Sequence, residues 1–591
     1  RDTVSWIRGR HRMKFGILTM RGNSFNTNSF SGSNVEGNFS FTNTFGTGYA
    51  MANFLLGLPT SEYRVNPGYL FKYAYLTRWT TQAFAQDDIQ MGPRLTINIG
   101  LRYENYGPWS EKTGRLSNFD LKTGNLVVPT STSIQLLDPN LVASYRGLIA
   151  TAAQAGFPES MVDFSRANFA PRVGFAYRFL KNTVIRAGYG IFYDFNPPAT
   201  QTGSQLYTSP QSYPINSIAN GTPLYQFPNP FATVNEAQGF GILSPSGAAA
   251  QERMPYSQQW SLTLERQFGN NLARLSYIGT AGVADLIQYN ANVPPPTTVQ
   301  LDQSARLYPQ FGPIGWVQNG PGHHYNGLSA DFTHRGSAGV YFDSNFTWAK
   351  DLGLNQGNGL DQNLGVLDPF NAKLDYGPTM NVPRFRWVTT ANWQLPVGHG
   401  KRYAPDLPTW ANYFAGGWTM TGVYTMQSGD WLTPTYCGFD PTGSPEQDFY
   451  CGRPDRLADG NLPGGQRSQT MWFNHAAFAF PGAAASNPLT PPDNPIGRFG
   501  NSGTGIIAGP GLWQLDLGLV KAVPIRENMH LNLFVFATNL LNHPSLADPQ
   551  MDISVPSTIG QILAIKSRQS AESNDPGIGM RVLTLGARFE F

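Results

Sequence analysis

Several stretches of the chain alternate strictly between apolar and polar positions. The clearest is 94–106, where the odd positions from Leu95 to Tyr103 are apolar and the even positions from Thr96 to Glu104 are polar or glycine. A period of two indicates a β-strand with one apolar face. Strands in soluble sheets usually run five or six residues, whereas a tilted strand that crosses a membrane needs about 9–11. The pattern therefore predicts membrane-spanning strands.

The last residues, 580–591, repeat this pattern. Leu583, Leu585 and Phe589 alternate with polar residues or glycine, and Arg588 lies on the polar side. An arginine facing lipid at the middle of a bilayer would cost about 2–4 kcal/mol. We therefore expect the apolar faces to point outward to lipid and the polar faces to line a hydrated lumen.

Similar strands come in pairs joined by two to five turn residues. Much longer connections, rich in Pro, Gly, Asn, Ser and Tyr, separate one pair from the next. Short periplasmic turns that alternate with long extracellular loops are typical of outer-membrane barrels. The predicted fold is an all-β, antiparallel transmembrane β-barrel. The predicted pairs are 2–8 with 12–21, 77–91 with 94–106, 170–179 with 183–194, 256–268 with 272–281, 325–334 with 338–350, and 512–523 with 529–541.

The predicted strands number about fifteen, which is odd. Bacterial single-chain barrels have even strand numbers, so we expect further strands to precede residue 1. Segments 38–43 and 60–67 are candidates for two more strands within the first long loop, and 47–57 for a short helix there. The connection 396–415 is long, but its place in the alternation is that of a periplasmic turn.

Composition narrows the class of protein. Of 591 residues, 41 are Lys or Arg and 38 are Asp or Glu, so 13% are charged, about half the usual share. Aromatic residues also make up 13%, which argues against disorder, and 63 Gly with 45 Pro exclude a coiled coil. A net charge of +3 gives no basic footprint for nucleic acid. No apolar run approaches the length of a membrane helix.

Four stretches, 85–106, 169–194, 256–281 and 325–350, resemble the C-terminal barrel of TonB-dependent outer-membrane receptors, and in particular the Oar-like branch. The resemblance implies a 22-stranded barrel, of which residues 1–591 form the C-terminal portion without the N-terminal plug and first strands. It implies a monomer in the cell outer membrane that imports a large or scarce substrate. The TonB complex would act through the missing region, and the barrel-assembly machinery would recognise the end that contains Phe589 and Phe591.

Aromatic residues in the long loops are candidate contacts for a small or oligomeric ligand, because rings beside Asn, Gln and Asp suit amphipathic ligands. Packing within the loops is the alternative for any single ring. The candidates are Tyr207, Tyr213, Tyr225, Trp316, Tyr325, Trp431, Tyr436 and Trp472.

Cys437 and Cys451 lie in one polar loop and suit a disulfide in an oxidising compartment, with two free thiols as the alternative. The sequence shows no HExxH or CxxC motif and no clustered histidines, so we expect no metal, no cofactor and no catalytic site. Two other functions remain open. One is a passive porin or surface adhesin without a plug; the other is a secreted all-β binding protein or enzyme, which would have shorter strands in regular repeats.

Overall fold

The fold is described from a computed structural model. It covers residues 1–26, 38–43, 45–67, 74–137, 139–194, 208–212, 216–219, 222–224, 226–228, 242–336, 339–354, 366–380, 382–444, 451–526, 529–566 and 580–591. Within these residues, no helix is both long and apolar enough to cross a membrane.

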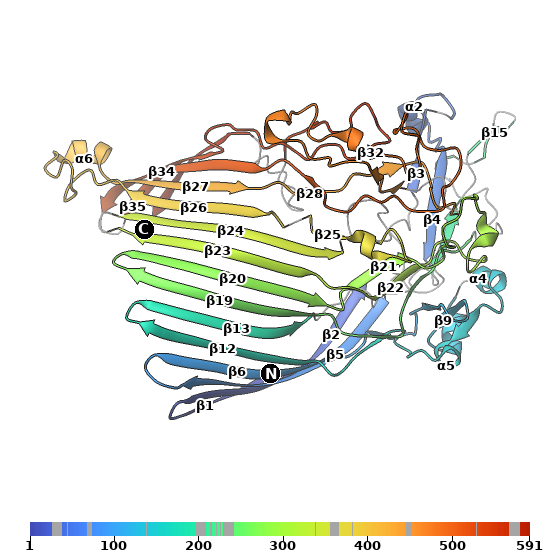
Figure 1. Cartoon of the computed structure of the whole chain (residues 1–591), viewed down its shortest axis with the longest axis horizontal. Coiled ribbons are helices and arrows are strands. Elements are labelled where there is room, and N and C mark those ends of the chain that lie inside the picture. Colours follow the sequence, from blue (N-terminus) through green and yellow to red (C-terminus); the bar gives the residue numbers. More distant parts are fainter. Residues whose placement is uncertain are drawn as a thin grey trace.

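One large antiparallel sheet of seventeen strands dominates the described residues (Figure 1). Two of them, β7 (Ser110–Glu111) and β25 (Tyr376–Pro378), are short strands at its long-loop end, where they pair with β5 and β24. The other fifteen form a continuous wall in which each strand pairs with the next one along. They are β1 (Asp2–Arg8), β2 (His11–Asn26), β5 (Ala74–Gln90), β6 (Leu95–Tyr106), β12 (Phe169–Leu180), β13 (Thr183–Tyr193), β19 (Tyr256–Phe268), β20 (Asn271–Val283), β23 (His324–Arg335), β24 (Val340–Leu354), β26 (Phe385–Gln394), β27 (Trp418–Gln427), β34 (Leu512–Arg526), β35 (Met529–Thr538) and β36 (Val582–Glu590).

The predicted transmembrane strands are confirmed, most of them to within a few residues. The main differences lie at strand ends. β2 continues to Asn26 and β24 to Leu354, so both extend into the loop region. The predicted turn at 524–526 is wrong. These residues complete β34, and the ladder with β35 shifts register between Pro524 and Arg526. A proline removes one ladder hydrogen bond, which a local irregularity at a strand end accommodates.

The two faces of the wall differ in chemistry as the alternation predicts. On β6, Ile99 and Leu101 are exposed on one face, while Glu104 lies on the other and is buried. On the final strand the outward residues Leu583 and Leu585 are 64% and 76% exposed. The same sidedness continues across the register: Leu585 pairs with Val535, which is also exposed. A continuous apolar outer surface fits hydrocarbon, not water.

All short connections lie at one end of the wall and all long ones at the other (Figure 1). The connection 396–415 lies at the short-turn end, as predicted, and contains α6 (Thr409–Ala415). The predicted helix within 47–57 is α2 (Ala50–Leu55). The other helices of the described residues lie in the long loops: α3 (Ser131–Gln135), α4 (Pro139–Ser144), α5 (Ala152–Ala155), and the 3-10 turns η3 (Gln303–Ala305), η4 (Ala372–Asp375), η6 (Gly464–Gln466) and η7 (His475–Ala477).

The segments 38–43 and 60–67 do form strands, but not in the wall. They contain β3 (Asn38–Ser40) and β4 (Ser61–Pro67), which make a small loop sheet with β14 (Thr208–Ser212). Further loop sheets are β8 (Asn118–Asp120), β9 (Asn125–Val128) and β10 (Ile149–Thr151); β11 (Asp163–Phe164) and β18 (Gln251–Glu252); β15 (Ile218–Ala219) and β16 (Thr222–Pro223); β17 (Ser246–Ala248), β21 (Leu286–Asn290) and β22 (Gly315–Asn319); β28 (Trp431–Leu432) and β33 (Ile507–Ala508); β29 (Tyr436–Cys437) and β30 (Cys451–Gly452); and β31 (Asp455–Arg456) and β32 (Phe478–Ala479).

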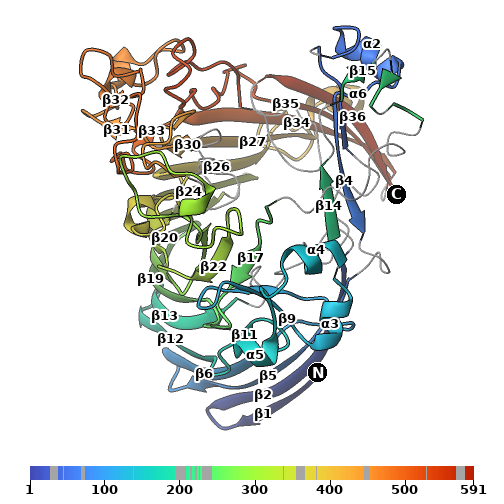
Figure 2. The same ribbon diagram turned by 90° about the vertical axis from the view of Figure 1, so that its right-hand side faces the viewer.

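The buried apolar cores of the protein lie in the long loops rather than in the wall. One core is centred on Phe119 and Leu126, joins residues 116–161 to 243–314, and includes Leu76 from the long-loop end of β5. A second, centred on Phe473 and Phe478, joins residues of the 432–507 connection to residues 553–559. The loops are therefore folded caps at the mouth of the wall (Figure 2).

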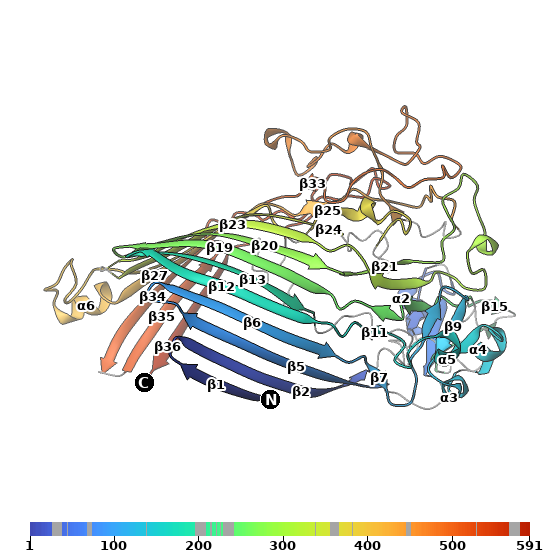
Figure 3. The same cartoon turned by 60° about the horizontal axis from the view of Figure 1, so that its bottom comes forward.

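The wall is curved, and β1 and β36 are its two edges (Figure 2). Among the described residues, β1 pairs with β2 alone and β36 with β35 alone. Both edge strands run toward the short-turn end, so they are parallel to each other (Figure 3).

Candidate functional site

The inward face of the wall carries a network of polar side chains. On β5 and β6, Gln82 donates a hydrogen bond to the Tyr106 hydroxyl at 3.0 Å, and this hydroxyl donates to Glu104 at 3.0 Å. Arg102 contacts both Gln82 and Glu104. Gln82 and Glu104 are nevertheless buried. Buried polar groups of this kind are stable only when they are paired, so the network orders the lumen side of these strands.

A second inward group lies on β13, β19 and β20. Glu265 is within 3.8 Å of Arg186 and 3.1 Å of Arg274. The sequence analysis missed this group. The register of the β19–β20 hairpin, which places Arg274 directly opposite Glu265, could have revealed it.

A third inward group, on β23 and β24, consists of carboxylate, hydroxyl and amide side chains. Asn345 donates hydrogen bonds to Ser329 at 2.9 Å and to Asp331, and Thr333 donates to Asp343 at 2.7 Å. Together the three groups line the wall with hydrogen-bonding side chains. The lumen face can therefore contact water or a polar solute.

At the mouth of the wall, the His323 ring and Asp285 pair at 2.8 Å. This hydrogen bond raises the pKa of His323. The candidate residue Tyr325 lies next to this pair, on the inward face of β23. Its hydroxyl lies over Gly327, where a Cβ would come within 2.5 Å of it, so the ring position requires glycine there.

Two of the candidate aromatic residues meet at one residue. Trp431 pairs with Ala508 across β28 and β33, and the Trp472 indole donates to the Ala508 carbonyl at 2.8 Å. The Arg467 guanidinium lies 5.4 Å from the Trp472 ring centre. Both tryptophans are half-buried. The Trp472 ring and the Arg467 cation therefore lie together in this loop cap, and the backbone of Trp431 passes beside Ala508, the residue that accepts the indole hydrogen bond.

Two other candidates are buried within the caps. Tyr436 is fully buried and packs against Phe480, with ring centroids 5.1 Å apart. Trp316 is 6% exposed and lies over Gly247. These rings pack inside the loops and present little or no surface to a ligand. Tyr207, Tyr213 and Tyr225 lie outside the described residues.

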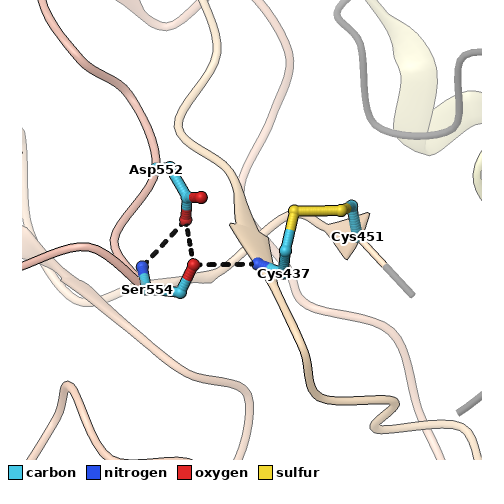
Figure 4. The surroundings of a disulfide bond; sticks show 4 residues. All are labelled: Cys437, Cys451, Asp552 and Ser554. Carbon is cyan, nitrogen blue, oxygen red and sulfur yellow. Dashed lines mark hydrogen bonds between the residues drawn. A yellow bond between two sulfur atoms is a disulfide. The ribbon is translucent and has the colours of Figure 1, made fainter. Parts of the chain in front are cut away.

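Cys437 and Cys451 form a disulfide that joins β29 to β30 (Figure 4). The Cys437 amide donates to the Ser554 hydroxyl at 3.2 Å, and the Ser554 amide donates to Asp552 at 2.8 Å (Figure 4). The disulfide therefore lies where two distant parts of the second loop core meet.

The same cap contains a buried ion pair that the sequence analysis missed. Arg453 is fully buried and lies 3.2 Å from Asp375 of η4. The pair links residues that are 78 positions apart, and no local pattern in the sequence marks either of them.

The chain ends with two exposed rings. Phe589 faces outward on β36, and Phe591 follows it with the ring centroids 6.0 Å apart. Within the part of the chain that the structure describes, no group of three or more His, Cys, Asp or Glu side chains could hold a metal ion.

Comparison with solved structures gives several similar proteins. A ferric enterobactin receptor from Pseudomonas aeruginosa is 11% identical, with a TM-score of 0.44 over 100% of this chain and 53% of that one. The siderophore receptor PirA from Acinetobacter baumannii is 10% identical, with a TM-score of 0.43 over 100% of this chain and 53% of that one. The chain thus spans about half the length of these receptors. No curated protein sequence matches it significantly.

The sequence profile of a family described as "Outer membrane beta barrel domain" matches residues 1–574. The match covers nearly the whole chain, including fourteen of the fifteen wall strands. The protein therefore belongs to the outer membrane beta-barrel domain family and resides in the outer membrane.

Proposed function

We propose that the chain is the C-terminal portion of the barrel of a TonB-dependent transporter that imports a large or scarce substrate. Two features together carry the proposal. The lumen face of the wall is polar and contains ion pairs, and folded loop caps lie at one mouth of the wall. A wall that served only as a membrane anchor would need neither feature. The proposal assigns no catalytic step to the chain.

The two edges of the wall support the idea that the barrel has further strands. Because β1 and β36 run in the same direction, antiparallel closure between them needs an odd number of additional strands. The 22 strands of the resembled family would supply seven. Those strands and the plug would belong to a region preceding Arg1, which would also contact the TonB complex. We propose that the closed barrel functions as a monomer.

The finer placement in the Oar-like branch rests on the four hairpin stretches that resemble it, such as 256–281. The substrate would first meet the loop caps. Trp431, Trp472 and Arg467 offer ring faces and a cation to an amphipathic or anionic ligand. Tyr325 would follow at the entrance to the lumen.

The test uses the parent protein purified from native outer membranes. A transporter with a plug should bind the periplasmic domain of TonB and show no steady ion conductance in a planar bilayer. A passive porin should conduct ions continuously and should not bind the TonB domain, and this result would overturn the proposal. A surface adhesin should neither conduct nor bind TonB, so the TonB arm distinguishes it from the transporter.

A further inference from the structure

Every short connection of the wall carries an exposed cation. Seven connections lie at the short-turn end of the described wall, and each has at least one exposed Arg or Lys within it or within three residues of it. These residues form what we call the cationic rim: Arg8, Arg10, Arg12, Arg94, Arg178, Lys181, Arg266, Arg335, Lys401, Arg402 and Arg526.

Acidic side chains do not balance this charge. Among the described residues of the same connections, Asp406 is exposed, whereas Asp87 and Asp88 are half-buried. Asp87 pairs with His11 at 2.6 Å and Asp88 accepts a hydrogen bond from Asn98 at 2.6 Å. At the end of β36, Glu590 is offset by Arg588 at 3.3 Å. The described residues of the short-turn end therefore carry a net positive charge, although the whole chain has a net charge of only +3.

Each of the seven connections also carries an exposed apolar or aromatic residue near one of its cations. Arg8 lies 6.0 Å from the Trp6 ring centre, and Arg402 lies 5.5 Å from that of Tyr403. At four other connections an exposed apolar residue stands within three residues of a rim cation in the sequence: Met91 and Arg94, Leu180 and Lys181, Phe268 and Arg266, and Ile525 and Arg526. At the β23–β24 connection Tyr341 is exposed and lies opposite Arg335, on the lumen side of the strands. Cations that extend from an apolar surface toward polar headgroups are the usual arrangement at a membrane boundary.

We propose that the cationic rim binds the phosphate groups of anionic phospholipids in the periplasmic leaflet of the outer membrane. The short-turn end is the periplasmic end of an outer-membrane barrel. Arginine and lysine near such a surface attract anionic headgroups. The short connections follow one another along the curved edge of the wall (Figure 3), and each of the seven carries at least one of the cations. Lipid surrounds a barrel on all sides, whereas a periplasmic protein would contact one part of the edge.

The experiment measures how strongly the full chain prefers an anionic lipid. The full-length protein that contains the chain is reconstituted in phosphatidylcholine vesicles that contain spin-labelled phosphatidylglycerol or spin-labelled phosphatidylcholine, and the immobilised fraction of each label is compared. The rim variant replaces Arg8, Arg266, Arg402 and Arg526 with Gln. The matched control replaces four exposed cations of the long-loop end, Lys122, Arg146, Arg253 and Lys350, with Gln.

We expect the unmodified protein to immobilise phosphatidylglycerol more than phosphatidylcholine. In the rim variant this preference should fall about fivefold, because each headgroup would lose its contact with roughly one cation. The control should keep the preference, and added salt should weaken it in the unmodified chain. Equal loss in both variants, or no preference in the unmodified chain, would overturn the proposal. Heat-dependent gel migration verifies that each variant is folded. The result does not depend on whether the protein is a transporter.

Discussion

Glu265 and Arg274 lie directly opposite each other on β19 and β20, with the carboxylate 3.1 Å from the guanidinium Nε. Both face inward, while their neighbour Leu264 is exposed on the outer face. On β19 the adjacent residues Leu264 and Glu265 therefore face opposite sides: the leucine faces lipid, and the glutamate forms its ion pair in the lumen. The same substitution should therefore have different effects on stability at two neighbouring positions of one strand, because one side chain faces lipid and the other faces the lumen.

The first prediction tests sidedness at the middle of β19. Leu262→Arg places a cation on the lipid-facing side and should destabilise the folded barrel by about 2–4 kcal/mol. Ser261→Arg, one residue earlier, places the same side chain in the lumen and should change stability by less than about 1 kcal/mol. Urea titration followed by heat-dependent gel migration measures both. Equal effects of the two variants would contradict the assignment of faces.

The second prediction concerns the strength of the Glu265–Arg274 pair. The Arg274 side chain is 42% exposed, so solvent weakens the attraction. A double-mutant cycle with Glu265→Gln and Arg274→Gln should give a coupling free energy of about 0.5–1 kcal/mol that falls in high salt. A coupling near zero would mean that Arg186 replaces Arg274 as the partner. Adding Arg186→Gln to the cycle measures that possibility.

The third prediction separates the caps from the wall. Replacing both Cys437 and Cys451 with Ser opens a ring of about 15 residues, which should destabilise the second loop core by about 3 kcal/mol. Limited proteolysis should then cut within 432–507 and 553–559 faster than in the unmodified chain, and not within β34 or β35. Heat-dependent gel migration of the wall should not change, because no wall strand forms part of the ring. Loss of the folded wall would show that caps and wall fold as one unit.

The fourth prediction is a pH dependence at the mouth. Burial raises the pKa of Glu252, which lies in the loop strand β18, from 4.5 to about 7. Between these values the folded state keeps a proton that the unfolded state has released, so local stability should fall by about 3 kcal/mol as the pH rises from 4.5 to 7. Hydrogen exchange of the Asn319 amide, which donates to Glu252 at 3.1 Å, reports this opening. In Glu252→Gln the protection of the Asn319 amide, corrected for intrinsic exchange, should not change with pH. If the protection of this variant still depended on pH, the effect would belong to another titrating group.

The sequence predicted the wall well because each spanning strand carries its own signal. Alternation over 94–106 needs no partner to be read, and β6 occupies nearly the same residues. The end of β34 was mistaken because Pro524 resembles a turn residue, although a strand end tolerates it.

The loop caps were less predictable because their packing joins residues far apart in the chain. Phe119 meets Phe311, and Arg453 meets Asp375, with no periodic pattern to mark either contact. For the same reason the sequence could not separate Tyr436, which is fully buried, from Trp431, which keeps exposed surface. Both are aromatic residues in polar surroundings, and only the long-range fold distinguishes them.

The last prediction concerns the terminal ring. If the barrel-assembly machinery recognises the end of β36, Phe591→Ala should reduce the amount of folded protein in the outer membrane of cells. Folding of the same variant into lipid vesicles without the machinery should be unchanged, because Phe591 lies beyond the last ladder residue, Glu590.

Phe175→Ala provides the matched control for this prediction, since Phe175 is also an exposed, lipid-facing ring but lies within β12. It removes a similar apolar area, so its effect should be equal in cells and in vesicles. If Phe591→Ala behaved in the same way, with equal effects in both settings, the ring would contribute lipid contact alone and the recognition proposal would be wrong.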